Sequence, residues 1–258
     1  MKRIIILSII VLILLTPVGI LSYSYYSPPK KRVAYQALRH DDDTLRIAFI
    51  GDSWAFLHKS HSHQLSAMIE NKLHHPIIVK SYGICGLTSK EIYEAFFEDN
   101  SYKEFMMYGF DYCIISSGIN DTYKKMGVSY YKRSMDLIIQ FLLANNISPI
   151  ILEIPDYDIQ KAYERQITWK KMLRQLSMSI NDTPLECKQL FRDALNELIK
   201  EKGYEQKVTI MRYKEWNANY EEDLKELYTD CMHLNQEGYN KLDNCLTSQI
   251  TLLVLMKK

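Results

Sequence analysis

The sequence predicts an α/β fold in which helices cover both faces of a parallel sheet. Short runs rich in β-branched residues alternate with longer amphipathic segments along the chain, which is the pattern of parallel strands joined by crossover helices. Hydrophobic residues make up 47% of the chain and charged residues 24%, a mixture typical of a protein with a packed core. The 32 basic and 31 acidic residues leave a net charge of +1, which argues against a nucleic-acid-binding protein.

The predicted elements follow one another in a regular order. Each predicted strand is a short apolar run, and the first three run into a turn that contains glycine. The predicted strands are Arg46 to Ile50, Ile77 to Tyr82, Tyr112 to Ser116, Pro149 to Ile154 and Lys207 to Met211. The predicted helices have apolar residues spaced by three or four positions. They are Gln64 to Leu73, Ser89 to Phe97, Tyr130 to Ala144, Tyr163 to Met178, Lys188 to Lys202 and Gln236 to Met256.

Residues 1–22 have the pattern of a membrane anchor or signal segment. Lys2 and Arg3 precede an apolar run from Ile4 to Leu21, close to the ~20 residues that a membrane-spanning helix needs. We favour an uncleaved anchor over a cleaved signal peptide, because the run is long and the small residues Ser22 and Ser24 form a weak cleavage signal. We therefore expect a protein that is membrane-anchored or exported to the cell envelope, with its folded domain outside the cytoplasm.

Residues 23–44 have the composition of a linker that leads to a folded domain at residues 45–258. The stretch contains Pro28 and Pro29, then three basic residues, and later three consecutive aspartates. Such charge runs can contact lipid headgroups. Both signs occur close together here, so we expect a solvated spacer instead.

Neither the cysteines nor the histidines form the pattern of a metal site. The five cysteines are too few for a disulfide scaffold and include no C-x-x-C pair. One disulfide would be compatible with an exported domain, and its pairing stays open. Six of the seven histidines lie between His40 and His75, and without a completing set of cysteine or carboxylate ligands we expect a solvated helix face. No metal or cofactor is expected.

Three turns that follow predicted strands carry candidate functional residues, because ligands of open α/β sheets bind beyond the carboxyl ends of the strands. The first turn, Gly51-Asp52-Ser53-Trp54, places Ser53 between a strand and a helix, where its hydroxyl can act as a nucleophile and its N–H can face an anion. The second, residues 82–89, contains Gly86, and the third contains Asn120. A glycine lets backbone N–H groups approach a substrate, and a carboxamide can donate to an oxyanion. By itself, the Gly-Asp-Ser string is more often an ordinary turn and N-cap, and ordinary turn and capping roles explain the other two motifs equally well.

His233 lies far beyond the other histidines and has an acidic residue near it. Asp230 and His233 are three residues apart, so within one turn the carboxylate can orient the imidazole and stabilise its protonated form. A serine nucleophile needs such a base. A D-x-x-H pattern alone is more often a capped turn, so the assignment depends on the other motifs.

Taken together, the four motifs resemble those of the SGNH hydrolase family, also called GDSL esterases or lipases. Gly51 to Trp54 is similar to the first block of the family, Gly83 to Ser89 to the second, Gly118 to Asp121 to the third and Asp230 to His233 to the last. The resemblance extends from about residue 45 to the C-terminus. It implies a flavodoxin-like, three-layer α/β/α sandwich with a parallel sheet of about five strands, and an enzyme that cleaves esters or related acyl groups without a metal.

The resemblance also implies roles for individual residues. Ser53 would be the nucleophile, His233 the general base and Asp230 the partner of the histidine. The backbone N–H groups of Ser53 and Gly86 and the side chain of Asn120 would form the oxyanion hole.

Other features concern the substrate. Trp54 replaces the leucine that is usual in the family, and Ser81 stands where many members carry asparagine, so we expect a pocket of unusual shape near the serine.

About fifty residues separate the fourth and fifth predicted strands, which is long for a crossover. This segment, with Tyr157, Tyr163 and Trp169, predicts either a lid or saccharide platform, or simply two helices packed on the sheet.

The favoured hypothesis is a serine esterase or acyl hydrolase that works through an acyl-enzyme. The anchor suggests an O-acetyl group on a cell-envelope carbohydrate as its substrate. An O-acyltransferase would use the same residues, and an inactive, membrane-anchored binding domain is the alternative from a different class. The expected partners are a small acyl ester or acylated saccharide and, through the N-terminal segment, the membrane; no nucleic acid is expected.

Overall fold

The computed structural model describes residue 16 and residues 22–256. The predicted anchor or signal segment at residues 1–22 therefore lies outside the described residues, apart from Thr16 and Ser22. Within the described part of the chain, none of the helices combines the length and apolar character needed to cross a membrane.

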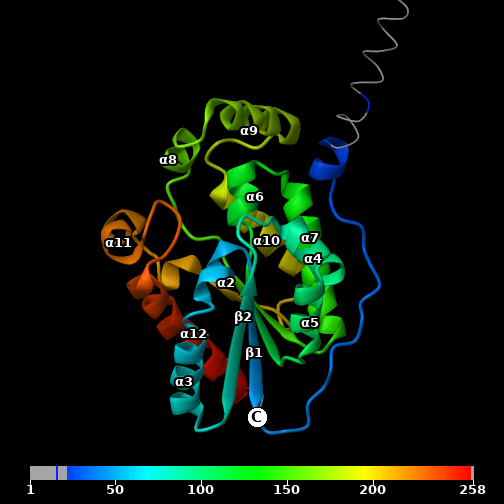
Figure 1. Ribbon diagram of the computed structural model, residues 1–258, viewed down its shortest axis with the longest axis vertical. Helices are drawn as coiled ribbons and strands as arrows, with labels where there is room; N and C mark the ends of the chain where they lie inside the picture. Colours follow the sequence, from blue (N-terminus) through cyan, green and yellow to red (C-terminus); the bar gives the residue numbers. More distant parts are fainter. Residues whose placement is uncertain (1–15, 17–21, 257–258) are drawn as a thin grey trace, which may run out of the picture.

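A five-stranded parallel sheet forms the centre of the domain, as predicted, with the strand order β2-β1-β3-β4-β5 (Figure 1). The strands are β1 (Leu45–Gly51), β2 (Ile77–Gly83), β3 (Tyr112–Ser116), β4 (Ser148–Leu152) and β5 (Thr209–Met211). The chain adds β2 on one side of β1 and the remaining strands on the other. Such a reversal opens a crevice beyond the carboxyl ends of β1 and β3, where open α/β sheets bind their ligands.

Helices cover both faces of this sheet and complete the predicted three-layer sandwich. Helices α3 and α12 lie on one face, while α4, α5, α7 and α10 lie on the other (Figure 1). Their bounds, with those of the remaining helices, are α2 (Ser53–His58), α3 (Ser62–Leu73), α4 (Ser89–Glu98), α5 (Asn100–Met107), α6 (Ile119–Lys124), α7 (Val128–Ala144), α8 (Ile159–Glu164), α9 (Thr168–Asn181), α10 (Lys188–Glu201), α11 (Tyr220–Leu227) and α12 (Gln236–Met256).

The core explains why the strand predictions hold. All five residues of β3 are buried, and so are the last five of β1, because helices cover these central strands on both sides. At helix α4, Thr88 and Glu91 form a capping box in which each side chain accepts a hydrogen bond from the other residue's backbone N–H. This reciprocal cap satisfies backbone donors that a helix start otherwise leaves unpaired.

Some helices differ from the prediction. The single helix expected at Tyr163 to Met178 is two helices, α8 and α9, because the chain turns near Gln166 after α8 has buried Ile159 and Ala162 in the domain. Four short helices within the domain were not predicted: α2, α5, α6 and α11. Each has only six or eight residues, too few for an apolar period to be recognised.

The segment at residues 23–44 is mostly exposed, as expected of a solvated spacer, but part of it packs against the domain. This segment runs along the face formed by α4, α5 and α7 (Figure 1). The ring of Tyr35 packs against Phe97 and Phe141, and the Ala37 N–H donates to Asn145 Oδ1 at 2.6 Å. Tyr35 thus partly buries its ring between α4 and α7, a contact that the charge pattern does not indicate.

The histidine-rich region is also more buried than a solvated helix face. His58 is completely buried and His61 nearly so, although His63, His74 and His75 are exposed or partly exposed. His58 Nε2 lies 2.7 Å from Asp243 Oδ1, and its Nδ1 lies 2.8 Å from Ser81 Oγ. This buried chain joins α2, β2 and α12, and it uses the Ser81 hydroxyl at a position where many family members carry asparagine.

We expect loss of one partner of the buried pair of His58 and Asp243 to destabilise the protein far more than loss of one partner of an exposed ion pair. Asp243→Ala leaves an imidazole nitrogen without its partner inside the core, so the free energy of unfolding should fall by about 3 kcal/mol. Glu98→Ala is the matched control, because it breaks the exposed ion pair with Arg32 and should cost less than about 1 kcal/mol. Urea denaturation measures both values, and equal losses would contradict the assignment.

Candidate active site

All the residues expected in the site line one pocket of about 500 Å³ at the carboxyl end of the sheet. Ser53, Gly86, Asn120, Asp230 and His233 come from four separate parts of the sequence and meet there. The remaining lining residues are Leu57, Cys85, Tyr123, Ala162, Arg165, Cys231 and Met232. A concave site with a few convergent polar groups is typical of the places where proteins bind small molecules.

The turn after β1 presents Ser53 to this pocket. Gly51 has a φ of +148°, and a Cβ placed on it would lie 2.0 Å from the carbonyl oxygen of Ser116, so only glycine lets β1 approach β3 this closely. The Asp52 carboxylate then caps α2 by accepting from the Trp54 N–H at 3.0 Å. Ser53 is consequently the first residue of α2 and sits where the strand gives way to the helix.

A chain of hydrogen bonds connects Ser53, His233 and Asp230. Ser53 Oγ lies 3.1 Å from His233 Nε2, and His233 Nδ1 lies 2.9 Å from Asp230 Oδ2. In this order an imidazole can accept the serine proton while the carboxylate fixes the ring and stabilises its charge. The structure therefore brings together the three side chains that the sequence suggested as a triad.

The short loop that carries Asp230 and His233 is held by its own backbone. Asp230 Oδ1 accepts from the N–H groups of Met232 at 2.7 Å and His233 at 2.8 Å. Burial raises the pKa of Asp230, but the hydrogen bonds from the His233 side chain and from these two N–H groups outweigh it, so the pKa of this carboxyl lies below its ordinary value. Asp230 is thus kept ionised beside the imidazole.

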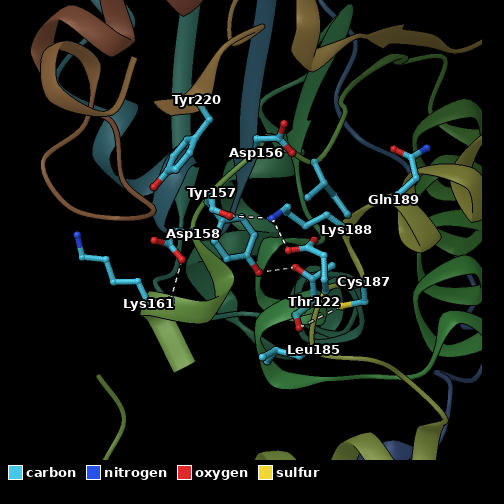
Figure 2. Close-up of polar contacts among 12 residues, drawn as sticks. Thr122, Asp156, Tyr157, Asp158, Lys161, Leu185, Cys187, Lys188, Gln189 and Tyr220 are labelled. Atoms are coloured by element: carbon cyan, nitrogen blue, oxygen red, sulfur yellow. Dashed lines mark hydrogen bonds and ion pairs between the residues drawn. The ribbon is translucent and has the colours of Figure 1, made fainter. Parts of the chain in front are cut away.

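Neighbouring elements fix the position of this loop on both sides. From α2, Trp54 Nε1 donates to the Met232 carbonyl at 3.2 Å. On the far side, the Asp158 N–H and the Tyr220 hydroxyl both donate to the Cys231 carbonyl, at 3.2 and 2.8 Å. Figure 2 shows the side chains of Asp158 and Tyr220, without the loop residue that they contact. The tryptophan that replaces the usual leucine therefore helps to align the histidine loop with the serine.

The candidate oxyanion donors surround the serine. The Ser53 N–H lies in the first turn of α2, where a helix leaves backbone donors free for an anion. Gly86 has a φ of +83° with open space where a Cβ would be, and Asn120 lies in the first turn of α6. Asn120 Nδ2 donates to Asp52 Oδ2 at 3.2 Å, and because a carboxamide nitrogen carries two hydrogens, the second can serve a substrate oxygen.

Asp52 has a supporting role that the sequence did not reveal. It is completely buried, and besides the bonds from Trp54 and Asn120 it accepts from Ser116 Oγ at 3.1 Å. Burial raises its pKa to about 6. At neutral pH it is therefore mainly an acceptor for these three donors, and it connects the serine turn to the Asn120 turn.

The long segment between β4 and β5 contributes one wall of the pocket. Ala162 lines it from α8 and Arg165 from the turn that follows, while Tyr123 lines it from α6. No pattern in the sequence points to Tyr123 or Arg165, because only the tertiary fold brings them to the pocket. The aromatic platform is not formed by the three residues considered for it. Tyr157 is buried with its hydroxyl 2.8 Å from Thr122 Oγ1 (Figure 2), Tyr163 on α8 is not among the residues that line the pocket, and Trp169 is exposed on α9.

The five cysteines, which all lie in the described part of the chain, are free thiols. Two of them, Cys85 and Cys231, line the pocket. The structure therefore contains none of the disulfides for which the sequence left room.

Comparison with known protein families decides the assignment. The model of the GDSL-like lipase/acylhydrolase family matches residues 49–241, which is most of the folded domain. The chain belongs to this family. As a GDSL hydrolase it acts on ester bonds, in agreement with the resemblance found in the sequence.

Solved structures agree on the fold. A lipase/acylhydrolase from Enterococcus faecalis shares 15% sequence identity with a TM-score of 0.56, over 80% of this chain and 95% of its own. An acetylxylan esterase from Geobacillus stearothermophilus shares 15% identity with a TM-score of 0.53, over 80% of this chain and 94% of its own. A GDSL-like lipase from Bacteroides thetaiotaomicron shares 15% identity with a TM-score of 0.51, over 81% and 88%. Among curated protein sequences, none matches this GDSL hydrolase.

A second buried carboxylate at the edge of the site makes the stability of this GDSL hydrolase depend on pH. Asp121 is completely buried and accepts from Ser89 N at 2.9 Å and from Ser89 Oγ at 2.5 Å. Burial raises its pKa to about 7. As the pH rises from about 4 to 8, the unfolded chain ionises this group before the folded protein does, so the Asp121 contribution to the free energy of unfolding should fall by roughly 4 kcal/mol.

Asp121→Asn tests this expectation. The amide can accept from the Ser89 N–H and donate to the Ser89 hydroxyl, but it cannot ionise. Urea denaturation across the same pH range should therefore show a smaller loss of stability in the variant than in the wild type. An unchanged pH dependence would contradict the assignment of the titration to Asp121.

Proposed function

We propose that this GDSL hydrolase is a serine esterase that transfers the acyl group of its substrate to Ser53 and then to water. The observation that carries the proposal is the hydrogen-bonded chain from Ser53 Oγ through His233 to Asp230, which opens on a pocket together with Gly86 and Asn120. This arrangement contains a nucleophile, a base, an orienting carboxylate and oxyanion donors, the set that acyl transfer requires.

The reaction follows from these positions. His233 Nε2 takes the proton of the serine hydroxyl while Oγ attacks the ester carbonyl, and the negative charge moves to the carbonyl oxygen. The N–H groups of Ser53 and Gly86 and the Asn120 carboxamide stabilise that oxygen. His233 then protonates the departing alkoxide, which leaves an acyl-enzyme. A water molecule, activated by the same imidazole, attacks the acyl group and releases the carboxylic acid and the free serine.

For the substrate, we propose an O-acetyl group on a carbohydrate of the cell envelope. The pocket of about 500 Å³ is lined by several apolar or thiol side chains beside the serine, including Leu57, Ala162 and Cys85, and this space suits a short acyl group. One of the proteins with a similar fold is named an acetylxylan esterase. The apolar run at residues 4–21 supports a membrane-anchored protein whose catalytic domain lies outside the cytoplasm.

Replacement of the serine gives the primary test. Ser53→Ala removes the nucleophile and should abolish acetate release from p-nitrophenyl acetate and from acetylated saccharides, while leaving the fold intact. A fluorophosphonate probe should label the wild type and not the variant. Turnover retained by Ser53→Ala would overturn the proposed mechanism, and an unlabelled wild type would favour an inactive domain.

The acceptor of the acyl group can be measured in the same assay. An esterase releases acetate to water at a rate that added saccharide does not alter. If an added unacetylated saccharide instead receives most of the acetyl groups, the protein is an O-acyltransferase that uses the same residues. Mass spectrometry of the saccharide distinguishes the two outcomes.

Loss of one oxyanion donor should slow the reaction without weakening binding to the same extent. Asn120→Ala is expected to lower kcat by about 10²–10³-fold, because the carboxamide helps most when charge develops on the carbonyl oxygen. Cys85→Ser is the matched control, since Cys85 lines the same pocket and has no role in the reaction. Equal kcat values for the two variants would exclude Asn120 from the oxyanion hole.

A further inference from the structure

Helix α9 has an inverted amphipathic arrangement. Five large apolar side chains point away from the protein with 45–64% of their surface exposed; they are Trp169, Met172, Leu173, Leu176 and Ile180. Their spacing of three or four residues places them along one side of the helix, which we call the α9 stripe. Of the fourteen residues of α9, only Ser177 is buried. A surface helix of a globular protein normally turns its apolar side toward the core instead.

The opposite side of α9 is polar and is fixed to the domain. The Arg174 guanidinium lies 5.5 Å from the centre of the Tyr123 ring and donates to the Lys124 carbonyl at 3.4 Å. Asn181 Nδ2 donates to the Lys125 carbonyl at 2.8 Å. These contacts set the rotation of the helix about its axis, so the outward direction of the stripe is determined by specific partners.

The N-terminal part of the chain meets the domain beside this helix. The Tyr26 hydroxyl lies 2.5 Å from Ser177 Oγ, and Lys90 Nζ donates to the carbonyls of Ser24 at 2.6 Å and Ser27 at 3.0 Å. Figure 1 shows the short helix at residues 22–26 at the same end of the molecule as α9. The apolar run of residues 4–21 directly precedes this contact in the sequence.

From these observations we propose that the α9 stripe lies in the surface of a lipid bilayer. A helix with a strong apolar side and a polar opposite side binds with its apolar residues at the boundary between headgroups and acyl chains. Tryptophan is favoured at this depth, and Lys170, exposed next to Trp169, can extend its ammonium toward the phosphates. The position of residues 22–26 favours lipid over a protein partner, because an apolar segment entering a bilayer there would bring that bilayer to α9.

A bilayer under the stripe would lie at the pocket end of the sheet, because Tyr123 both lines the catalytic pocket and holds Arg174 of α9. The inference that α9 contacts lipid depends on the proposed membrane anchor. It does not depend on the proposed ester hydrolysis. Failure of one can therefore be distinguished from failure of the other.

Tryptophan fluorescence of the full-length protein tests the inference. Trp54 and Trp216 are 1% and 2% exposed, whereas Trp169 is 55% exposed, so lipid quenchers should reach Trp169 far better than the others. The protein is reconstituted with phosphatidylcholine–phosphatidylglycerol vesicles, and the vesicle-bound fraction is isolated by flotation. Lipids brominated in the upper part of the acyl chain should quench the emission of the wild type, and Trp169→Phe should remove this quenching.

Substitutions in the stripe provide the matched comparison. The double variant L173E/L176E should remain vesicle-bound through residues 4–21 but lose the quenching of Trp169. Leu252→Glu is the control, because Leu252 is also exposed but lies on the last turns of α12, at the other end of the molecule (Figure 1); it should quench like the wild type. Far-UV circular dichroism checks that each variant is folded.

Three results would overturn the inference. Flotation of the wild type without quenching would show that α9 is away from the lipid, even though the anchoring proposal holds. Absence of flotation would contradict both. Quenching that persists in L173E/L176E would show that the stripe does not bring Trp169 to the bilayer.

Discussion

The buried carboxylate of Asp52 is the group on which the geometry of the site depends. It accepts hydrogen bonds from the Trp54 N–H in the serine turn, from Ser116 at the end of β3 and from the Asn120 carboxamide in α6. One charged group thereby sets the positions of nucleophile and oxyanion donor relative to each other. Its burial is unfavourable, as the raised pKa indicates, and the three donors offset that cost.

The parallel sheet makes it possible to predict this arrangement from the sequence. Because every strand runs in the same direction, each turn that follows a strand arrives at the same edge, and motifs far apart in the chain meet there. The buried runs of β1 and β3 could be recognised from their β-branched residues. The turns after β1, β2 and β3 could be recognised from their glycines and from Ser53 and Asn120. The loop that carries Asp230 and His233 could be predicted because a serine nucleophile needs a base.

Other features depended on contacts that a single sequence does not display. The helices α2 and α6 are too short to show a period, and their ends are determined by the caps and bonds of the site. His58 pairs with Asp243 across 185 positions, and Tyr35 finds its aromatic partners only after α4 and α7 have packed. Arg165 reaches the pocket because α8 and α9 are separate helices, whereas the sequence suggested one continuous helix.

The link between Ser53 and His233 spans 180 positions of the chain. The Asp230–His233 pair can form locally. Its alignment with Ser53 requires the complete sheet and the hydrogen bond from Trp54 to the loop that carries Asp230 and His233. Pairings between such distant segments are slow to form, because chain entropy is lost before the contacts are gained. Recovery of catalysis after dilution from denaturant would thus report the formation of this long-range pairing and not of any local element.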